Sequence, residues 1–141
     1  MENLGKTECL FCKIIRGEIP SEKIYEDGDT FVFLDIHPNN PGHTLVIPKK
    51  HSENLYDIDD HSLAAVMRTV QKVARAIKTA VEADGINIAM NNESAAGQVI
   101  FHPHLHVIPR FKEDGYRHWP HKSYKEGEAA GIASKIRANL S

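Results

Sequence analysis

Residues 102–110 read His-Pro-His-Leu-His-Val-Ile-Pro-Arg, so single residues separate three histidines. Strict alternation of this kind is typical of a β-strand, in which every second side chain lies on the same face. On a strand, His102, His104 and His106 would share one face of a sheet, whereas a helix would spread them over more than half of its circumference. The sequence therefore predicts a strand over 99–109 that carries the functional side chains.

In the segments around this histidine stretch, apolar residues recur either at every second position or at the spacing of a helix. Period-two patterns predict four further strands, over residues 23–26, 30–35, 43–48 and 86–91. Helical spacing of apolar residues predicts one long helix over 60–83, with an aspartate to cap its start and a glycine just past its end. Short helices are predicted over 9–17 and 129–140. Because strands cluster on either side of one long helix without regular βα alternation, we predict an α+β domain with an antiparallel sheet.

Length, charge and hydropathy narrow the class of protein. The chain has 141 residues, of which 41% are hydrophobic and 26% charged, as is typical of one globular domain. We predict a single domain over 1–141, in which residues 111–141 form a less regular C-terminal tail. The net charge of −2 gives no basic surface for nucleic acid. No apolar run reaches the length of a membrane span, and residues 1–6 lack the apolar core of a signal peptide, so we expect a cytoplasmic protein.

Cys9 and Cys12, which lie three positions apart, are the only cysteines. In a reducing compartment such a pair is typical of a metal or redox site. No strand is predicted before the pair, which disfavours a thioredoxin-like redox motif and leaves zinc or free thiols. A structural zinc ion needs four Cys or His ligands, so two histidines must come from elsewhere, and His51 and His102 are candidates. The alternative for His51 is a solvated loop residue.

The three alternating histidines leave two kinds of chemistry open. They could bind a catalytic metal, but positions i, i+2 and i+4 of a strand lie too far apart to converge on one ion, although two of them could chelate it. A histidine can also act as a nucleophile towards phosphorus, or as an acid or base near neutral pH. Packing alone explains three imidazoles on one face poorly, because buried imidazoles need polar partners.

The preceding loop, Ala95-Ala96-Gly97-Gln98, favours phosphorus chemistry. Small residues let backbone N–H groups approach an anion closely, and Gln98 can bind a leaving group. The sequence contains no Walker P-loop and no dinucleotide-binding fingerprint. We therefore expect this loop and the histidines to bind the phosphate.

The stretch His102-Pro103-His104-Leu105-His106-Val107-Ile108 resembles the signature of the histidine triad (HIT) family, His-x-His-x-His followed by two apolar residues. Further motifs match in the family's order, at residues 11–20, 33–35, 42–49 and 97–98. The chain is similar to bacterial-type members that carry a zinc motif, and its His-Pro-His also resembles related nucleotidylyltransferases that act on sugar phosphates. The resemblance implies a HIT-like antiparallel sheet that continues across a homodimer.

The activity that the resemblance implies is specific. HIT proteins bind purine nucleotides of the AMP or GMP type and cleave the α-phosphate bond of nucleoside phosphoramidates or dinucleoside polyphosphates, through a nucleotidyl-histidine intermediate. In this sequence His104 matches the nucleophile, His106 a ligand of the α-phosphate, and His43 the supporting histidine on the neighbouring strand. The ligands of a structural zinc ion match Cys9, Cys12, His51 and His102.

The resemblance also assigns the contacts to the nucleotide. Asp35 matches the carboxylate that holds the ribose hydroxyls. The base pocket matches Phe11, Ile14, Phe33 and Ile36, and the phosphate and leaving-group loop matches Asn91, Gly97, Gln98 and Val99. Many relatives carry serine where this chain has Val99, so a hydroxyl contact to the phosphate is missing and the backbone N–H remains. Trp119 lies in the least matched region and is expected either to reach a partner subunit's site or to pack.

Two other classes of function remain as alternatives. A binding module would use nucleotide occupancy to regulate a protein partner, and it would keep its cellular function after the substitution His104→Ala. A metal-dependent hydrolase would use the histidine stretch as ligands, and activity that survives exhaustive chelation with an intact fold would exclude it.

Overall fold

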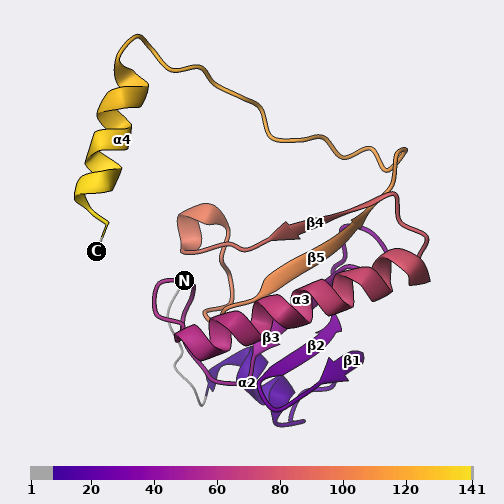
Figure 1. The fold of residues 1–141 in the computed structure, drawn as a ribbon. Coiled ribbons are helices and arrows are strands. Elements are labelled where there is room, and N and C mark those ends of the chain that lie inside the picture. The colour runs from indigo at the N-terminus through magenta and orange to yellow at the C-terminus, as the bar shows by residue number, and fades with distance from the viewer. Residues whose placement is uncertain (1–7, 141) are drawn as a thin grey trace.

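A five-stranded antiparallel sheet lies at the centre of the computed structural model, which describes residues 8–140 (Figure 1). Its strands are β1 (Lys23–Glu26), β2 (Thr30–Leu34), β3 (Thr44–Pro48), β4 (Gly85–Ala89) and β5 (Leu105–Arg110). They lie in the order β1-β2-β3-β5-β4, and every neighbouring pair is antiparallel. The predicted α+β class and antiparallel sheet are confirmed.

The helical segments around the sheet are α2 (Leu10–Ile15), α3 (Asp60–Ala80), the 3₁₀ turn η1 (Ser94–Ala96) and α4 (Glu128–Ala138). The long helix α3 begins where the sequence predicts it, because the Asp59 carboxylate accepts a hydrogen bond from the backbone N–H of Ser62 and caps the helix. The short helix α2 ends before Gly17, whose φ of +79° a helix does not allow. A capping signal therefore sets the start of α3 and a glycine signal the end of α2, whereas α3 ends at Ala80, earlier than predicted, and Gly85 is the first residue of β4.

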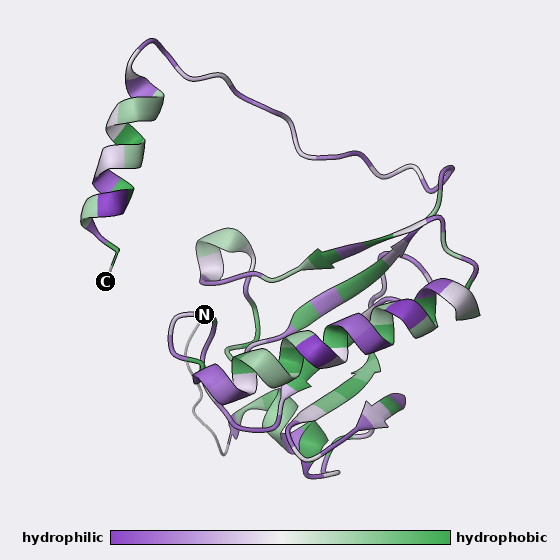
Figure 2. Cartoon of the chain, viewed as in Figure 1, coloured by the Kyte–Doolittle hydropathy of each residue, from purple (hydrophilic) through white to green (hydrophobic). Residues whose placement is uncertain are grey.

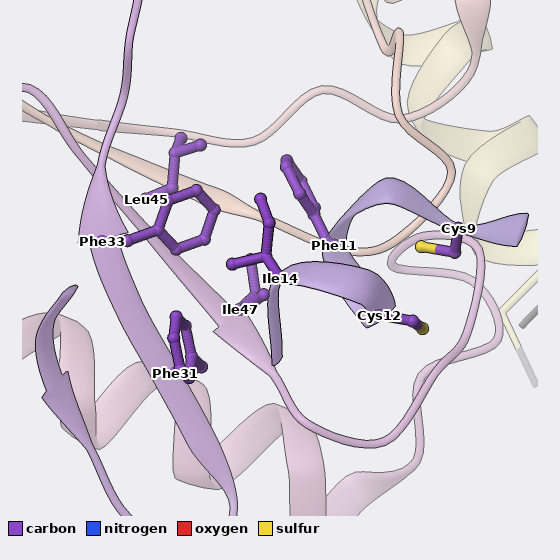
Figure 3. Close-up of a cluster of buried hydrophobic side chains, with 8 residues drawn as sticks. All are labelled: Cys9, Phe11, Cys12, Ile14, Phe31, Phe33, Leu45 and Ile47. Carbon is purple, nitrogen blue, oxygen red and sulfur yellow. The ribbon is translucent and has the colours of Figure 1, made fainter. Parts of the chain in front are cut away.

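The central strands β2 and β3 are buried on both faces, because α3 covers one face of the sheet and α2 covers the other. On the α3 face, one cluster joins Val32, Val46, Val66, Val70, Val73, Ile77, Leu105 and Val107. On the α2 face, a second cluster joins Cys9, Phe11, Cys12, Ile14, Phe31, Phe33, Leu45 and Ile47 (Figure 3). Successive residues of β2 and β3 belong to opposite clusters, which explains why these strands are apolar almost throughout (Figure 2).

The strand that carries the histidines is shorter than predicted, since β5 begins at Leu105 rather than at residue 99. Its ladder with β3 extends no further towards the N-terminus than this residue. Just ahead, Pro103 has no backbone N–H to donate to a neighbouring strand. His102 and His104 therefore lie on an irregular segment that precedes the strand, and only His106 lies on β5 itself.

The C-terminal tail, residues 111–127, runs without helix or strand from the end of β5 to α4. Figure 1 shows the tail leading away from the sheet on the side of β4, so that α4 lies apart from the rest of the chain. Trp119 in this tail is 88% exposed, and no residue of α4 is buried. The apolar side chains of α4 are therefore left uncovered by the described part of the chain.

None of the helices within residues 8–140 is long and apolar enough to span a membrane. The predicted lack of a signal peptide concerns residues 1–6, which lie outside the described residues.

Candidate active site and metal centre

The four predicted zinc ligands lie together beside α2. Cys9 precedes the first residue of this helix and Cys12 follows one turn later. His51 comes from the loop after β3, and His102 from the irregular segment before β5. The donor atoms of the four side chains all lie within 4.8 Å of one another. Three separate segments of the chain therefore converge on one small volume.

The distances between these donor atoms fit a tetrahedral zinc ion. The Nδ1 of His102 lies 3.5 Å from the Sγ of Cys9 and 3.6 Å from the Sγ of Cys12. The Nδ1 of His51 lies 3.4 Å from the Cys12 Sγ and 3.3 Å from the His102 Nδ1. With Zn–S bonds of about 2.3 Å and Zn–N bonds of about 2.05 Å, tetrahedron edges measure about 3.6 Å between S and N and about 3.3 Å between two N atoms. The residues present therefore fit a structural Cys₂His₂ site.

The ring of His102 is oriented for metal binding. It is fully buried, and its Nε2–H donates a hydrogen bond of 2.7 Å to the Pro48 carbonyl. Burial lowers the pKa of His102 to about 4, so the ring is neutral at physiological pH. With the proton on Nε2, the lone pair on Nδ1 faces the two thiols, as a zinc ligand requires.

His104 presents one unprotonated ring nitrogen. Its Nδ1–H donates a hydrogen bond of 2.7 Å to the carbonyl of His102, which leaves a lone pair on Nε2. Burial lowers the pKa of His104, so the ring is neutral near pH 7. The ring lies edge-on to those of Phe11 and His106, with 5.1 Å between centroids in each pair. His104 can therefore act as a positioned, neutral nucleophile.

A chain of hydrogen bonds sets the tautomers of His43 and His106. The backbone N–H of Asn39 donates to the Nδ1 of His43 over 3.0 Å, so the neutral His43 ring carries its proton on Nε2. This Nε2–H donates to the Nδ1 of His106 over 2.9 Å, which places the proton of His106 on its own Nε2. Burial lowers the pKa of both rings, so both are neutral at physiological pH. His106 can therefore donate a hydrogen bond to an anion beside His104.

Asp35 lies beside the His43–His106 pair, just after β2. One of its carboxylate oxygens accepts a hydrogen bond of 2.8 Å from the backbone N–H of His37, and the other lies 3.5 Å from the Nε2 of His43. Asp35, His43 and His106 also offer ligand atoms within 4.8 Å of one another. The hydrogen bond between the two rings accounts for their close approach, because a proton lies between the facing nitrogens. This trio is therefore better arranged for hydrogen bonding than for holding a metal ion.

The residues predicted to line a base pocket divide into a buried group and one exposed side chain. Phe11, Ile14 and Phe33 belong to the α2-face cluster and are buried (Figure 3). Ile36 is 80% exposed in the loop that follows β2. The Phe11 ring lies edge-on to Phe33, with 5.5 Å between centroids, and also contacts His104. Phe11 therefore connects this buried cluster to the candidate nucleophile.

Gln98, predicted to bind a leaving group, holds the small-residue loop from inside. Its side chain is 2% exposed, and its Oε1 accepts a hydrogen bond of 2.8 Å from the backbone N–H of Glu93. Its Nε2 donates to the carbonyls of Glu53 and Ile100 over 2.7 and 3.1 Å. Both N–H donors of the amide are therefore used within the protein, and a contact to a leaving group has to replace one of them.

The turn after η1 brings the other predicted loop residues together. Gly97 has a φ of +97°, a left-handed conformation that favours glycine. A Cβ atom on Gly97 would lie 3.5 Å from the Nδ2 of Asn91, so the two residues are neighbours. Val99 is 58% exposed and supplies no hydroxyl at this position. Any hydrogen bond that residue 99 makes to a phosphate must come from its backbone N–H.

Asn39 and Pro48 contact the candidate site through main-chain groups, and sequence reasoning missed both. Their backbone N–H and C=O groups set the tautomers of His43 and His102. Main-chain groups act in the same way whatever side chain they carry, so residue type does not reveal them. The only local signal is the density of turn residues in 37–42, which predicts a loop but not the direction of its N–H groups.

Comparison with known proteins places this chain in a family. A sequence model described as the HIT domain matches residues 16–113. The "Protein hit" of Bacillus subtilis is 46% identical over 136 residues, which cover 94% of this chain and 94% of that protein. The "Adenylylsulfatase HINT3" of Arabidopsis thaliana is 40% identical and covers 96% of this chain and 71% of that protein.

Solved structures agree with the sequence relatives. The crystal structure of a HIT family member from Bacillus subtilis has a TM-score of 0.88 at 43% identity, over 95% of this chain and 98% of that chain. A zinc-bound histidine triad family protein from Mycobacterium smegmatis has a TM-score of 0.76 at 39% identity, over 96% of this chain and 100% of that chain.

Proposed function

This chain belongs to the HIT domain family, and on that premise we propose that it is a hydrolase of purine nucleotide conjugates. It cleaves the bond between the α-phosphate and the leaving group of nucleoside phosphoramidates or dinucleoside polyphosphates. The observation that carries the proposal is the Nε2 of His104, which bears a lone pair beside the Nε2–H of His106. One ring is thus arranged as a nucleophile, and its neighbour as a donor to the phosphate under attack.

In the proposed reaction the Nε2 of His104 attacks the α-phosphorus. A P–N bond forms, and the bond to the leaving group breaks and leaves its electron pair on that group, which takes a proton from solvent. The His104 ring becomes cationic, and the His102 carbonyl that accepts its Nδ1–H stabilises this charge. Water then attacks phosphorus, breaks the P–N bond and returns a proton to solvent, which releases the nucleoside monophosphate and restores His104.

The remaining contacts to the nucleotide follow the family pattern in this proposal. They come from Phe11, Ile14, Phe33, Asp35, Ile36, Asn91, Gly97, Gln98 and Val99. Asp35 suits the ribose hydroxyls, because only one of its two carboxylate oxygens accepts a backbone hydrogen bond. His43 supports His106 through the hydrogen bond between their rings, and His106 binds the α-phosphate.

The substitution His104→Ala tests the proposal. Loss of a covalent nucleophile lowers turnover by a factor of about 10⁴ or more, whereas nucleotide affinity measured by calorimetry should change little. Turnover is compared for an adenosine phosphoramidate, a dinucleoside polyphosphate, a nucleotidyl sugar and adenylyl sulfate, the last because one relative is named an adenylylsulfatase. The substitution His61→Ala, at an exposed histidine outside the site, is the control. Unchanged turnover in His104→Ala would overturn the assignment, and binding of nucleotide without turnover of any substrate would support a binding module.

We also propose a structural zinc ion held by Cys9, Cys12, His51 and His102. The donor distances support it, as does the similarity to a zinc-bound relative. Zinc would tie α2 to the loop after β3 and to the segment before β5, and it would supply no step of the reaction. Activity that persists after chelation, with the fold intact, would exclude the alternative of a metal-dependent hydrolase.

A homodimer is the assembly we propose. The strand β4 pairs with β5 alone, so it is one of the two edge strands of the sheet within residues 8–140, and Ile88 on this strand is 43% exposed. The tail carries α4 towards the same side, with Ile132 and Ile136 left 38% and 58% exposed (Figure 1). A second copy that pairs at β4 and covers α4 would bury both surfaces.

Sedimentation measurements test this assembly. The double substitution of Ile132 and Ile136 by Glu should shift the protein from dimer towards monomer, because charged side chains would replace the apolar stripe of α4. The substitution Ser134→Glu on the same helix adds a charge at a polar position and should leave the dimer intact. A dimer unaffected by the double substitution would contradict a role for α4.

A cytoplasmic location remains part of the proposal, because two buried cysteines that form no disulfide suit a reducing compartment. That residues 1–141 form a single domain also remains a prediction.

A further inference from the structure

The end of β5 and the segment that follows it are hydrogen-bonded to the loop that leads into β3. The Nδ2 of Asn40 donates to the carbonyl of Pro109 over 2.9 Å and to the carboxylate of Asp114 over 3.1 Å. The hydroxyl of Tyr116 donates to the carbonyl of Asn39 over 2.8 Å. Two residues of the loop, far from the tail in sequence, are therefore held by three hydrogen bonds.

Asp114 is the centre of this arrangement. Its carboxylate accepts two hydrogen bonds from the Arg110 guanidinium, at 2.7 and 3.1 Å, and one of 3.0 Å from each backbone N–H of Phe111 and Tyr116. The Arg110 guanidinium holds the pKa of Asp114 well below its usual range, so the carboxylate stays ionised at physiological pH. The side chain of Asp114 is only 6% exposed. The Asp114 carboxylate is therefore a fixed, charged acceptor for the hydrogen bond from the Asn40 amide.

Asn39 links this network to the candidate active site. Its carbonyl accepts a hydrogen bond from the Tyr116 hydroxyl, while its N–H donates one to the Nδ1 of His43. The next residue, Asn40, accepts a hydrogen bond of 3.0 Å from the backbone N–H of His43 and is tied to Asp114 through its side chain. The conformation that aims the Asn39 N–H at His43 is thus held at the Asn39 carbonyl and at the residue that follows it.

We infer that Asp114 and Tyr116 are positioning residues that set where the protons of His43 and His106 lie. They hold the Asn39 N–H on the Nδ1 of His43, which keeps the His43 proton on Nε2 and hence the His106 proton on its own Nε2. Both residues lie beyond the segment 16–113 that the HIT domain model matches. The C-terminal tail of this chain thus takes part in the active site through its first turn.

The consequence of losing this support follows from the same hydrogen bonds. If the Asn39 N–H turns away, the Nδ1 of His43 can carry the proton, and its Nε2 then becomes an acceptor towards His106. The hydrogen bond between the rings survives only if His106 holds its proton on Nδ1. The Nε2 of His106 then presents a lone pair, rather than an N–H, to a phosphate. This effect on turnover rests on the proposed function, whereas the effect on the tautomers does not.

The experiment compares Tyr116→Phe and Asp114→Asn with the wild-type protein. Tyr116→Phe removes a single hydroxyl and keeps the ring, so it leaves the packing in place. The control is Tyr124→Phe, the same change at a tail tyrosine that is 68% exposed. The readout is the ¹⁵N shift of each imidazole nitrogen in the unliganded protein above pH 7, because protonated and unprotonated ring nitrogens differ widely. Turnover of an adenosine phosphoramidate is measured alongside.

The wild-type protein and the control should show His43 and His106 protonated on Nε2. Both variants should show a population protonated on Nδ1, and kcat should fall by about 10-fold with little change in KM. Wild-type tautomers in both variants would overturn the inference, even if turnover falls. Shifted tautomers in a protein whose turnover survives His104→Ala would uphold the inference and overturn only the proposed function.

Discussion

Truncation of His102 tests the metal centre and its supporting contacts together. The ring is fully buried, so His102→Ala leaves a cavity, and large-to-small substitutions in a core cost about 2–5 kcal/mol. The change also removes the donor to the Pro48 carbonyl, and an unsatisfied buried acceptor costs about 1–3 kcal/mol. Partial collapse or entry of water reduces this sum, so we expect the free energy of unfolding to fall by about 4 kcal/mol. Loss of a ligand to the proposed zinc ion acts in the same direction.

The assay is urea unfolding of the purified protein, with zinc content measured on the same sample. Wild-type protein should carry about one zinc ion per chain, and His102→Ala much less than one. The control is His61→Ala, because the His61 side chain is 72% exposed and pairs with Asp29 only at the surface. It should leave both the unfolding midpoint and the zinc content unchanged. Wild-type zinc content in His102→Ala, with a loss of stability below about 1 kcal/mol, would refute the reasoning.

Two further predictions concern the loop before β3 and the dependence of stability on pH. Gly42 has a φ of +100°, and a Cβ atom there would lie 3.2 Å from Val81, so Gly42→Ala should lower the free energy of unfolding by about 1–2 kcal/mol. Gly28→Ala, at a position with open space, should leave the free energy of unfolding unchanged. Equal midpoints of urea unfolding for the two variants would contradict this prediction. Burial lowers the pKa of His43 and His106 below their ordinary value, so the unfolded state binds more protons below pH 6.5. The free energy of unfolding should therefore fall as the pH drops below 6.5, and it should fall more steeply in the wild-type protein than in His43→Gln. If urea unfolding gives the same dependence of this free energy on pH in both proteins, the lowered pKa of His43 is refuted.

The spacing of apolar residues, together with the residues typical of turns and helix caps, predicts most of the fold from sequence. The strand at 23–26 and the start of α3 lie where the patterns place them, because each depends on local capping or on alternation against a nearby face. The start of β5 lies later than predicted, because alternation indicates which side chains share a direction but not whether a neighbouring strand can pair with them. Pro103 interrupts that pairing, so two of the three histidines precede the strand.

The candidate site is predictable as a set of side chains but not as a network of hydrogen bonds. The spacing of Cys9 and Cys12 indicates two ligands from one helical turn, and the structure brings His51 and His102 to them. In contrast, the role of the Asn39 N–H depends on the conformation of a loop. That loop is bonded to Tyr116, a contact between distant segments that no local pattern specifies.

Covalent capture tests the central claim most directly. The protein is mixed with an adenosine phosphoramidate, quenched during turnover under conditions that preserve P–N bonds, digested and examined by mass spectrometry. The account predicts a peptide containing His104 that is heavier by one nucleotidyl group, and no such peptide from His104→Ala. A nucleotidyl group on another residue, or turnover by His104→Ala at the wild-type rate, would contradict it.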